Sequence, residues 1–140
     1  MADRATISAT LERYYDAWEA RDHELYRTVW AEGAVFADPP TDGEVAPTGF
    51  DQILAGMEEI WSRAESIVYD RHRMWHCGHS VAVHSTVVMV LADALAHVPL
   101  IHVFRFDDVG LIRRLEAFLD FDQVEMVEGE RPDWMPLTEH

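Results

Sequence analysis

Hydrophobic residues recur at helical spacing along the first part of the chain. Residues 6–20 are predicted to form a helix. Its apolar stripe consists of Ile7, Leu11, Tyr14, Tyr15 and Trp18. A short second helix is predicted over residues 23–31, with Gly33 ending it. A third helix is predicted to open at Thr48, because Thr48 followed by Asp51 resembles a capping box. Its apolar side consists of Phe50, Ile53, Leu54, Met57, Ile60 and Trp61.

After residue 64 the hydrophobic period changes to two, which is typical of strands. An earlier short strand, over residues 34–37, is followed by a loop over residues 38–47. Helices first and antiparallel strands afterwards indicate an α+β domain, with the helices packed on one face of a curved sheet. The later strands are predicted over residues 66–75, 81–91, 95–106 and 111–121.

Length and charge narrow the possible functions. The chain of 140 residues suits one domain, which we place at residues 1–124, with an acidic tail or partner-covering arm at 125–140. The net charge of −15 argues against nucleic acids and anionic membranes as partners, because both require a cationic surface. No apolar run reaches the roughly 18 residues of a membrane span, and we expect no signal peptide. The single cysteine, Cys77, fits a reducing compartment, so we expect a cytoplasmic protein.

Asp38 is the most informative residue, because it ends a hydrophobic strand and is followed by Pro39 and Pro40. A carboxylate in that position is well placed at the mouth of an apolar pocket. Burial there would raise its pKa and allow it to transfer protons near neutral pH. The alternative is an aspartate that initiates a turn before proline. The chain contains no lysine, since all 11 basic residues are arginine, and this excludes Schiff-base chemistry on a lysine.

The order of these motifs resembles the NTF2-like superfamily, in the branch that holds ketosteroid isomerases, SnoaL-type polyketide cyclases and limonene-epoxide-hydrolase relatives. The resemblance covers residues 7–122. It is carried by LERYYDAW at 11–18, AEGAVFADP at 31–39, TGFD at 48–51 and HVFRF at 102–106. It implies three helices packed on a strongly curved, mostly antiparallel sheet that encloses a conical pocket. Relatives commonly dimerise through the exposed sheet face, so we expect a homodimer.

The resemblance also implies site residues. In the steroid isomerases a tyrosine on the first helix and a protonated aspartic acid on a late strand form the oxyanion hole, and an aspartate before a proline is the base. Tyr14 matches the tyrosine, although spacing alone does not choose between Tyr14 and Tyr15. Asp38 matches the base. The late acid is replaced by His102, which can still donate a hydrogen bond and can change charge near neutral pH.

Strand alternation places His102 on the face that the family turns toward the pocket. If the following hairpin has a three-residue turn centred on Asp93, His84 lies directly opposite His102 and is a fourth catalytic candidate. Dehydratases of the superfamily use a histidine on a comparable strand with an acid from the first helix, which makes Glu19 a secondary candidate. The substrate pocket is expected to be lined by Trp18, Phe36, Phe50, Leu54, Trp61, Phe104 and Leu119.

His72, His76, Cys77 and His79 resemble metal ligands in their spacing. On a strand, His72 and His76 lie about 13 Å apart and cannot share one ion, although His76 and His79 could converge. We therefore expect no metal and no cofactor.

The favoured hypothesis is an acid–base enzyme, an isomerase, cyclase or dehydratase, acting on a small apolar molecule with a carbonyl or epoxide. Asp38 would move the proton, and Tyr14 and His102 would stabilise the developing negative charge. The alternative is a non-catalytic ligand-binding or oligomerisation module. An epoxide-hydrolase-type Asp–Arg–Asp set is a weaker third possibility, because Arg105 alternates away from His102.

Overall fold

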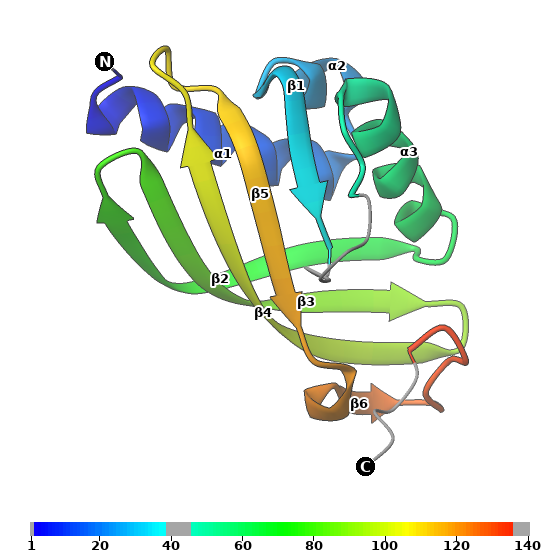
Figure 1. Ribbon diagram of the computed structural model, residues 1–140. Coiled ribbons are helices and arrows are strands. Elements are labelled where there is room, and N and C mark those ends of the chain that lie inside the picture. The colour runs from blue at the N-terminus through cyan, green and yellow to red at the C-terminus, as the bar shows by residue number, and fades with distance from the viewer. Residues whose placement is uncertain (1, 39–45, 136–140) are drawn as a thin grey trace.

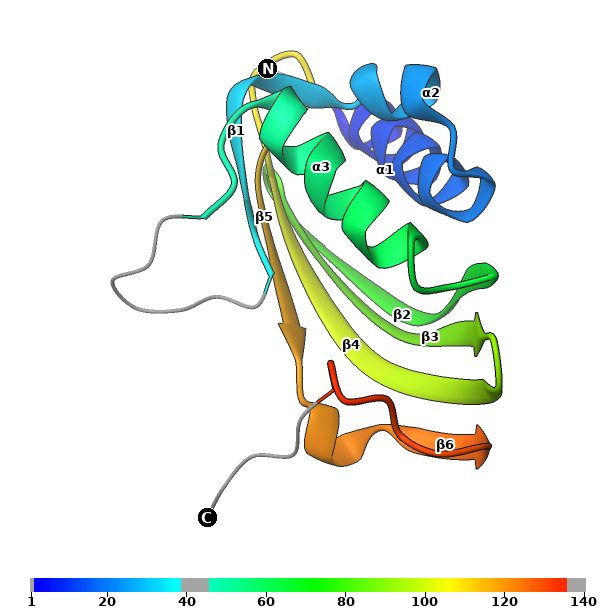
Figure 2. The ribbon, with the colours of Figure 1, turned by 90° about the vertical axis from the view of Figure 1, so that its right-hand side faces the viewer.

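Three helices lie in the concave side of one curved sheet of six strands (Figures 1 and 2). This computed structural model describes residues 2–38 and 46–135. Pro39, Pro40 and most of the expected loop up to Pro47 lie outside the described residues. Within the described part of the chain, no helix is long and apolar enough to cross a membrane. The elements in chain order are α1 (Arg4–Ala20), α2 (His23–Arg27), β1 (Trp30–Ala37), α3 (Phe50–Trp61), β2 (Ser66–Cys77), β3 (Ser80–Leu91), β4 (Ala94–Phe106), β5 (Ile112–Leu119), the 3-10 helix η1 (Phe121–Gln123) and β6 (Glu125–Glu128).

The sheet has the strand order β1-β5-β4-β3-β2, and β6 pairs with β4 beyond the end of β5. Only the β1–β5 pair is parallel among these pairings, so the sheet is mixed but mostly antiparallel. Figure 2 shows the strands curling around α1 and α3. The predicted α+β architecture is confirmed, and the curvature creates a concave face whose side chains can surround a ligand.

The helix starts follow from short polar side chains. Asp3 caps α1 by accepting a hydrogen bond from the Thr6 backbone, and Asp22 caps α2 in the same way. The prediction of a capping box at the start of α3 is wrong. The cap residue there is Gly49, and the Thr48 backbone N–H donates to the Gln52 side chain instead.

The second helix ends four residues earlier than predicted, at Arg27 rather than at residue 31. Trp30 already belongs to β1, where it pairs with Ile112 of β5. A strand partner far along the chain thus overrides the local helical pattern. Gly33, with a φ of 70°, lies inside β1 where the register shifts, so it forms an irregularity in a strand rather than ending a helix.

The hairpin between β3 and β4 has a two-residue turn, because Leu91 pairs with Ala94. This register places Val83, not His84, opposite His102. A change of one residue moves every side chain of a strand to the other face, so His84 lies on the outer, exposed face of the sheet. The expected cross-strand histidine pair is therefore wrong.

The segment expected to be a tail contributes to the domain as far as residue 135. Residues 125–128 form β6, and the Met135 side chain is completely buried. Arg131 fixes this segment by donating from its guanidinium to the backbone carbonyl of Phe121 at 2.7 Å, and to that of Met135 at 3.4 Å.

Candidate active site

A cavity of about 200 Å³ lies between the helices and the concave face of the sheet. Its wall is mostly apolar, and four polar or ionisable side chains interrupt it: Asp38, Arg63, Tyr69 and His102. The apolar lining consists of Trp18, Phe36, Ile60, Ile67, Val87, Met89, Val98, Leu100, Ala117, Leu119, Phe121, Trp134 and Met135. An apolar cavity with a few polar groups is the usual form of a small-molecule site.

Asp38 lies directly after the last residue of β1 and lines the cavity. Its carboxyl keeps contact with solvent, yet the surrounding protein is close enough that desolvation raises its pKa from 3.8 to about 6. Among the described residues, none forms an ion pair or hydrogen bond with it. Asp38 is therefore a carboxylate that can accept a proton near neutral pH, with its oxygens free for a ligand.

His102 lies on the inner face of β4 and is 2% exposed. Its Nδ1 is 2.9 Å from the hydroxyl of Tyr15, on α1. Burial lowers the pKa of His102 to about 3, so its imidazole is neutral at physiological pH. Nε2 has no hydrogen-bond partner within the described residues and is not sealed from the cavity that His102 lines.

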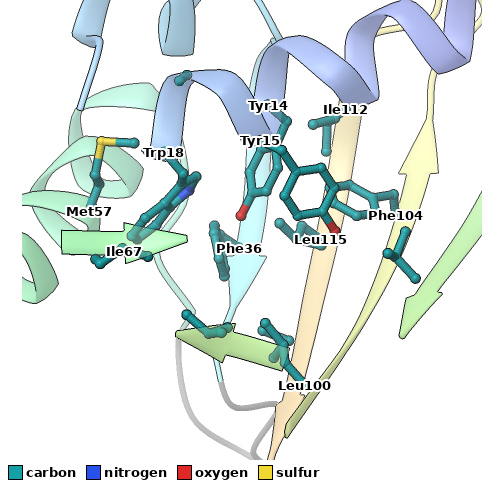
Figure 3. Close-up of a cluster of buried hydrophobic side chains, with 14 of the residues drawn as sticks. Tyr14, Tyr15, Trp18, Phe36, Met57, Ile67, Leu100, Phe104, Ile112 and Leu115 are labelled. Atoms are coloured by element: carbon teal, nitrogen blue, oxygen red, sulfur yellow. The ribbon is translucent and has the colours of Figure 1, made fainter. Parts of the chain in front are cut away.

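The tyrosine in contact with the site histidine is Tyr15, whereas the family resemblance favoured Tyr14. Figure 3 shows both rings descending from α1 with their hydroxyl groups directed toward the sheet. The Tyr14 hydroxyl is buried, has no partner within the described residues, and does not line the cavity. Burial raises the pKa of Tyr14 well above its usual range, so it stays neutral. A role for Tyr14 in catalysis remains a prediction.

Tyr69, on the inner face of β2, is a site residue that sequence reasoning missed. Its ring lies 5.0 Å from that of Tyr15 and 5.9 Å from that of His102, measured between centroids. Burial raises its pKa, and the charge of Asp38 adds to this. The alternation of Ile67 with Tyr69 in a predicted strand was the signal that could have identified it.

Three of the expected lining residues, Trp18, Phe36 and Leu119, do line the cavity. Phe104 is fully buried in the core beneath it, in contact with the rings of Tyr14, Tyr15 and His102. The other three are partly buried residues of α3 packed against the core outside the cavity lining. These are Phe50, Leu54 and Trp61.

Two acid–base candidates lie outside the cavity. His84 is exposed on the outer face, where its ring is 5.1 Å from that of His72. Glu19 accepts a hydrogen bond from the backbone N–H of Tyr69 at 2.9 Å, so it joins α1 to the edge of the sheet. Neither side chain lines the cavity, so a catalytic role for His84 or Glu19 stays a prediction.

Arg63 and Trp134 belong to the cavity wall and also escaped prediction. The guanidinium of Arg63 lies 5.2 Å from the Trp134 ring and is paired with Glu59, one turn earlier on α3. Trp134 and Met135 come from the segment that was expected to be a tail. No local pattern identifies them, because their role depends on the chain returning to the sheet after β6.

The described residues include no group of three side chains that could hold a metal ion. Cys77 is an exposed free thiol at the end of β2. The ionisable side chains that line the cavity are Asp38, Arg63, Tyr69 and His102.

Comparison with known proteins places this geometry in context. The sequence matches the SnoaL-like domain over residues 11–115. No curated protein matches it.

Solved structures share the fold at low sequence identity. An NTF2-like protein of unknown function from Burkholderia pseudomallei has a TM-score of 0.73 and 19% identity, covering 86% of this chain and 92% of its own. A candidate polyketide cyclase from Sinorhizobium meliloti has a TM-score of 0.65 and 22% identity, covering 79% and 94%. An LEH-like epoxide hydrolase of Mycobacterium tuberculosis has a TM-score of 0.68 and 16% identity, covering 83% and 84%. All three identities are below 25%, so these similarities concern the fold alone.

Proposed function

The chain belongs to the SnoaL-like domain family, and from this premise we propose that it is a cofactor-free acid–base enzyme acting on a small, largely apolar carbonyl compound. One observation carries the proposal. A carboxylate with a pKa of about 6 and a neutral histidine with an unpaired Nε2 line the same apolar cavity. A proton acceptor and a hydrogen-bond donor in one apolar site are what proton transfer next to a carbonyl requires.

In the proposed step, the Asp38 carboxylate takes a proton from the carbon adjacent to the carbonyl. The electron pair of the broken C–H bond forms the C=C bond of an enolate, and negative charge develops on the oxygen. His102 Nε2–H donates a hydrogen bond to that oxygen. Asp38 then returns the proton to carbon at the same or another position, so the enzyme is regenerated without a cofactor.

The hydrogen bond from Tyr15 determines which tautomer of His102 is present. Tyr15 is neutral, since burial raises its pKa, and its hydroxyl carries one proton. If Tyr15 donates to Nδ1, the imidazole proton must be on Nε2. In the opposite arrangement the buried Tyr15 proton would lack an acceptor, because no other hydrogen bond of this hydroxyl occurs among the described residues. Tyr15 is therefore a positioning residue that presents Nε2–H to the ligand.

Enolate formation is the first step of a double-bond shift, of some cyclisations and of some dehydrations, and the proposal covers these classes. The similarity to a candidate polyketide cyclase supports the same type of chemistry. An epoxide-opening site has less support, because Arg105 donates to Ser80 and does not line the cavity. A purely oligomeric module would more simply have its interior filled by aromatic side chains, and a ligand-binding module would bind the probe below without accelerating exchange. The proposed location is the cytoplasm, which the single free thiol supports.

The test is deuterium exchange at a carbon next to a carbonyl. Phenylacetone carries one ring and an activated CH₂ group, and NMR in D₂O follows the loss of its protons. We expect the wild-type protein to accelerate exchange, and Asp38→Asn to lower the catalysed rate at least about 100-fold, as expected for removal of a general base. Thermal unfolding and phenylacetone binding of the variant control for folding. Equal exchange rates for wild type and Asp38→Asn would refute the assignment of Asp38.

A further inference from the structure

A second cavity, also of about 200 Å³, lies against α3 and is likewise lined by Asp38. The two cavities share part of their walls, namely Trp18, Phe36, Asp38 and Ile60. The remaining lining of the second cavity consists of Pro47, Ile53, Gly56, Met57 and Glu59. Figure 3 shows Met57 of α3 beside Trp18 of α1, at this side of the core. Asp38 is therefore reached from two apolar spaces rather than one.

Gly56 lies at the exposed rim of the second cavity. Ile53, Met57 and Ile60 form the inward stripe of α3, and Gly56 lies beside that stripe. A Cβ atom added at Gly56 would meet nothing within 4 Å. Glycine is unfavourable inside a helix, so its presence there calls for a packing or functional reason. The reason consistent with the geometry is that glycine leaves the mouth of the second cavity uncovered.

The second cavity suits an apolar group. Among the described residues that line it, Glu59 is the only ionisable side chain besides Asp38, and Glu59 is paired with Arg63. A dry apolar cavity of roughly 150 Å³ accepts benzene, so a space of this size can accept one aromatic ring or a branched alkyl group. The first cavity has the same volume, and each space alone is too small for a substrate of several fused rings.

We infer that the natural substrate carries two separate apolar groups, each about the size of one ring, on either side of the carbon that Asp38 deprotonates. This inference rests on the proposed function for the role of Asp38, but the binding geometry can be tested independently. One group occupies the cavity against the sheet. The other occupies the cavity at Gly56.

Two matched probes test this inference. Phenylacetone and deoxybenzoin both contain a benzyl ketone, and they differ in that the second carries a phenyl ring where the first carries a methyl group. Calorimetry measures the affinity of each probe. We expect the wild-type protein to bind deoxybenzoin at least about 10-fold more tightly, because the extra ring has a cavity to enter.

Gly56→Leu places a bulky side chain at the rim of the second cavity and should lower the ratio of deoxybenzoin to phenylacetone affinity at least about 10-fold. Gly56→Ala should lower it less, and it protects the test against misfolding because alanine favours a helix. Ala55→Leu is the control, since Ala55 is exposed like its neighbour Gly56 but lines neither cavity. It should leave the ratio at its wild-type value. An unchanged ratio in Gly56→Leu, or equal affinity of the two probes for the wild-type protein, would overturn the inference.

The failures of the two proposals are distinguishable. If Asp38→Asn retains exchange while Gly56→Leu lowers the affinity ratio, the two-cavity binding mode holds and the catalytic role fails. If exchange depends on Asp38 while the affinity ratio is unchanged in Gly56→Leu, the enzyme assignment holds and the substrate class inferred from the second cavity is wrong.

Discussion

Desolvation shifts the pKa values of Asp38 and His102 in opposite directions. Poor solvation penalises the charged form of each, which raises the pKa of the carboxyl to about 6 and lowers that of the imidazole to about 3. Above pH 6 the site therefore holds an ionised base and a neutral donor. This separation supports the two roles proposed for Asp38 and His102.

The pH dependence of proton exchange follows from these values. The active form of Asp38 is ionised, so the catalysed rate should rise with pH, with a midpoint about 6, and then reach a plateau. His102 should add no falling limb near neutral pH, because it has already lost its proton far below that range. Exchange of phenylacetone measured between pH 4.5 and 8.5 tests this. A falling limb centred near pH 6.5, or a flat profile, would show that another group controls the rate.

Tyr14 and Tyr15 offer a matched pair of substitutions. Both rings are almost completely buried, but only the Tyr15 hydroxyl has a partner. Tyr15→Phe should lower the free energy of unfolding by about 1–3 kcal/mol, because it leaves the buried Nδ1 of His102 unpaired. Tyr14→Phe should change it by less than about 0.5 kcal/mol, since the hydroxyl that it removes makes no hydrogen bond. Urea denaturation measures the free energy of unfolding of both variants. Equal destabilisation by the two substitutions would contradict this assignment of hydrogen-bond partners.

At the scale of elements, the hydrophobic period of the sequence predicted the features that depend only on neighbouring residues. The prediction of which residues face inward from β4 was correct, because alternation alone places Leu100, His102 and Phe104 on one side. The position of His84 depended on the number of residues in one turn, which the sequence leaves open, and a single residue reversed the result. The hydrophobic pattern also does not tell which of Tyr14 and Tyr15 contacts His102. Both rings are buried, and only the structure shows which hydroxyl lies at hydrogen-bond distance from the imidazole.

Segments whose structure depends on distant partners were predicted least well. The start of β1 was read as helix because its partner, β5, lies about 80 residues further along the chain. Residues 125–135 were predicted to belong to a tail, because their acidic composition is typical of an exposed segment. Two of their side chains are nevertheless buried or half-buried, namely Met135 and Trp134. The polar centre of the site was predicted from Asp38 and His102. The wall contributed by the C-terminal segment was not.

At the scale of the whole molecule, the outer face of the sheet exposes large apolar side chains. Val68, Trp75, Ile101 and Phe118 are each between 45% and 49% exposed. Ile101 and Phe118 are direct neighbours across β4 and β5, which makes part of this surface continuous. We propose that two copies of the chain associate through this face, since a contiguous exposed apolar patch marks an interaction surface.

The net charge of −15 on each copy opposes that association. Because salt screens the repulsion while leaving the apolar contact intact, dimerisation should strengthen between about 50 and 300 mM NaCl. Light scattering coupled to size exclusion measures the mass at both salt concentrations. Phe118→Asp should shift the protein toward monomer, because it places a charge in the centre of the apolar contact. Val109→Asp is the control, since Val109 is 70% exposed in the turn between β4 and β5 and carries the same change in charge away from the face. A wild-type monomer at both salt concentrations would exclude this dimer, and equal effects of the two substitutions would show that charge alone, not the sheet face, governs association.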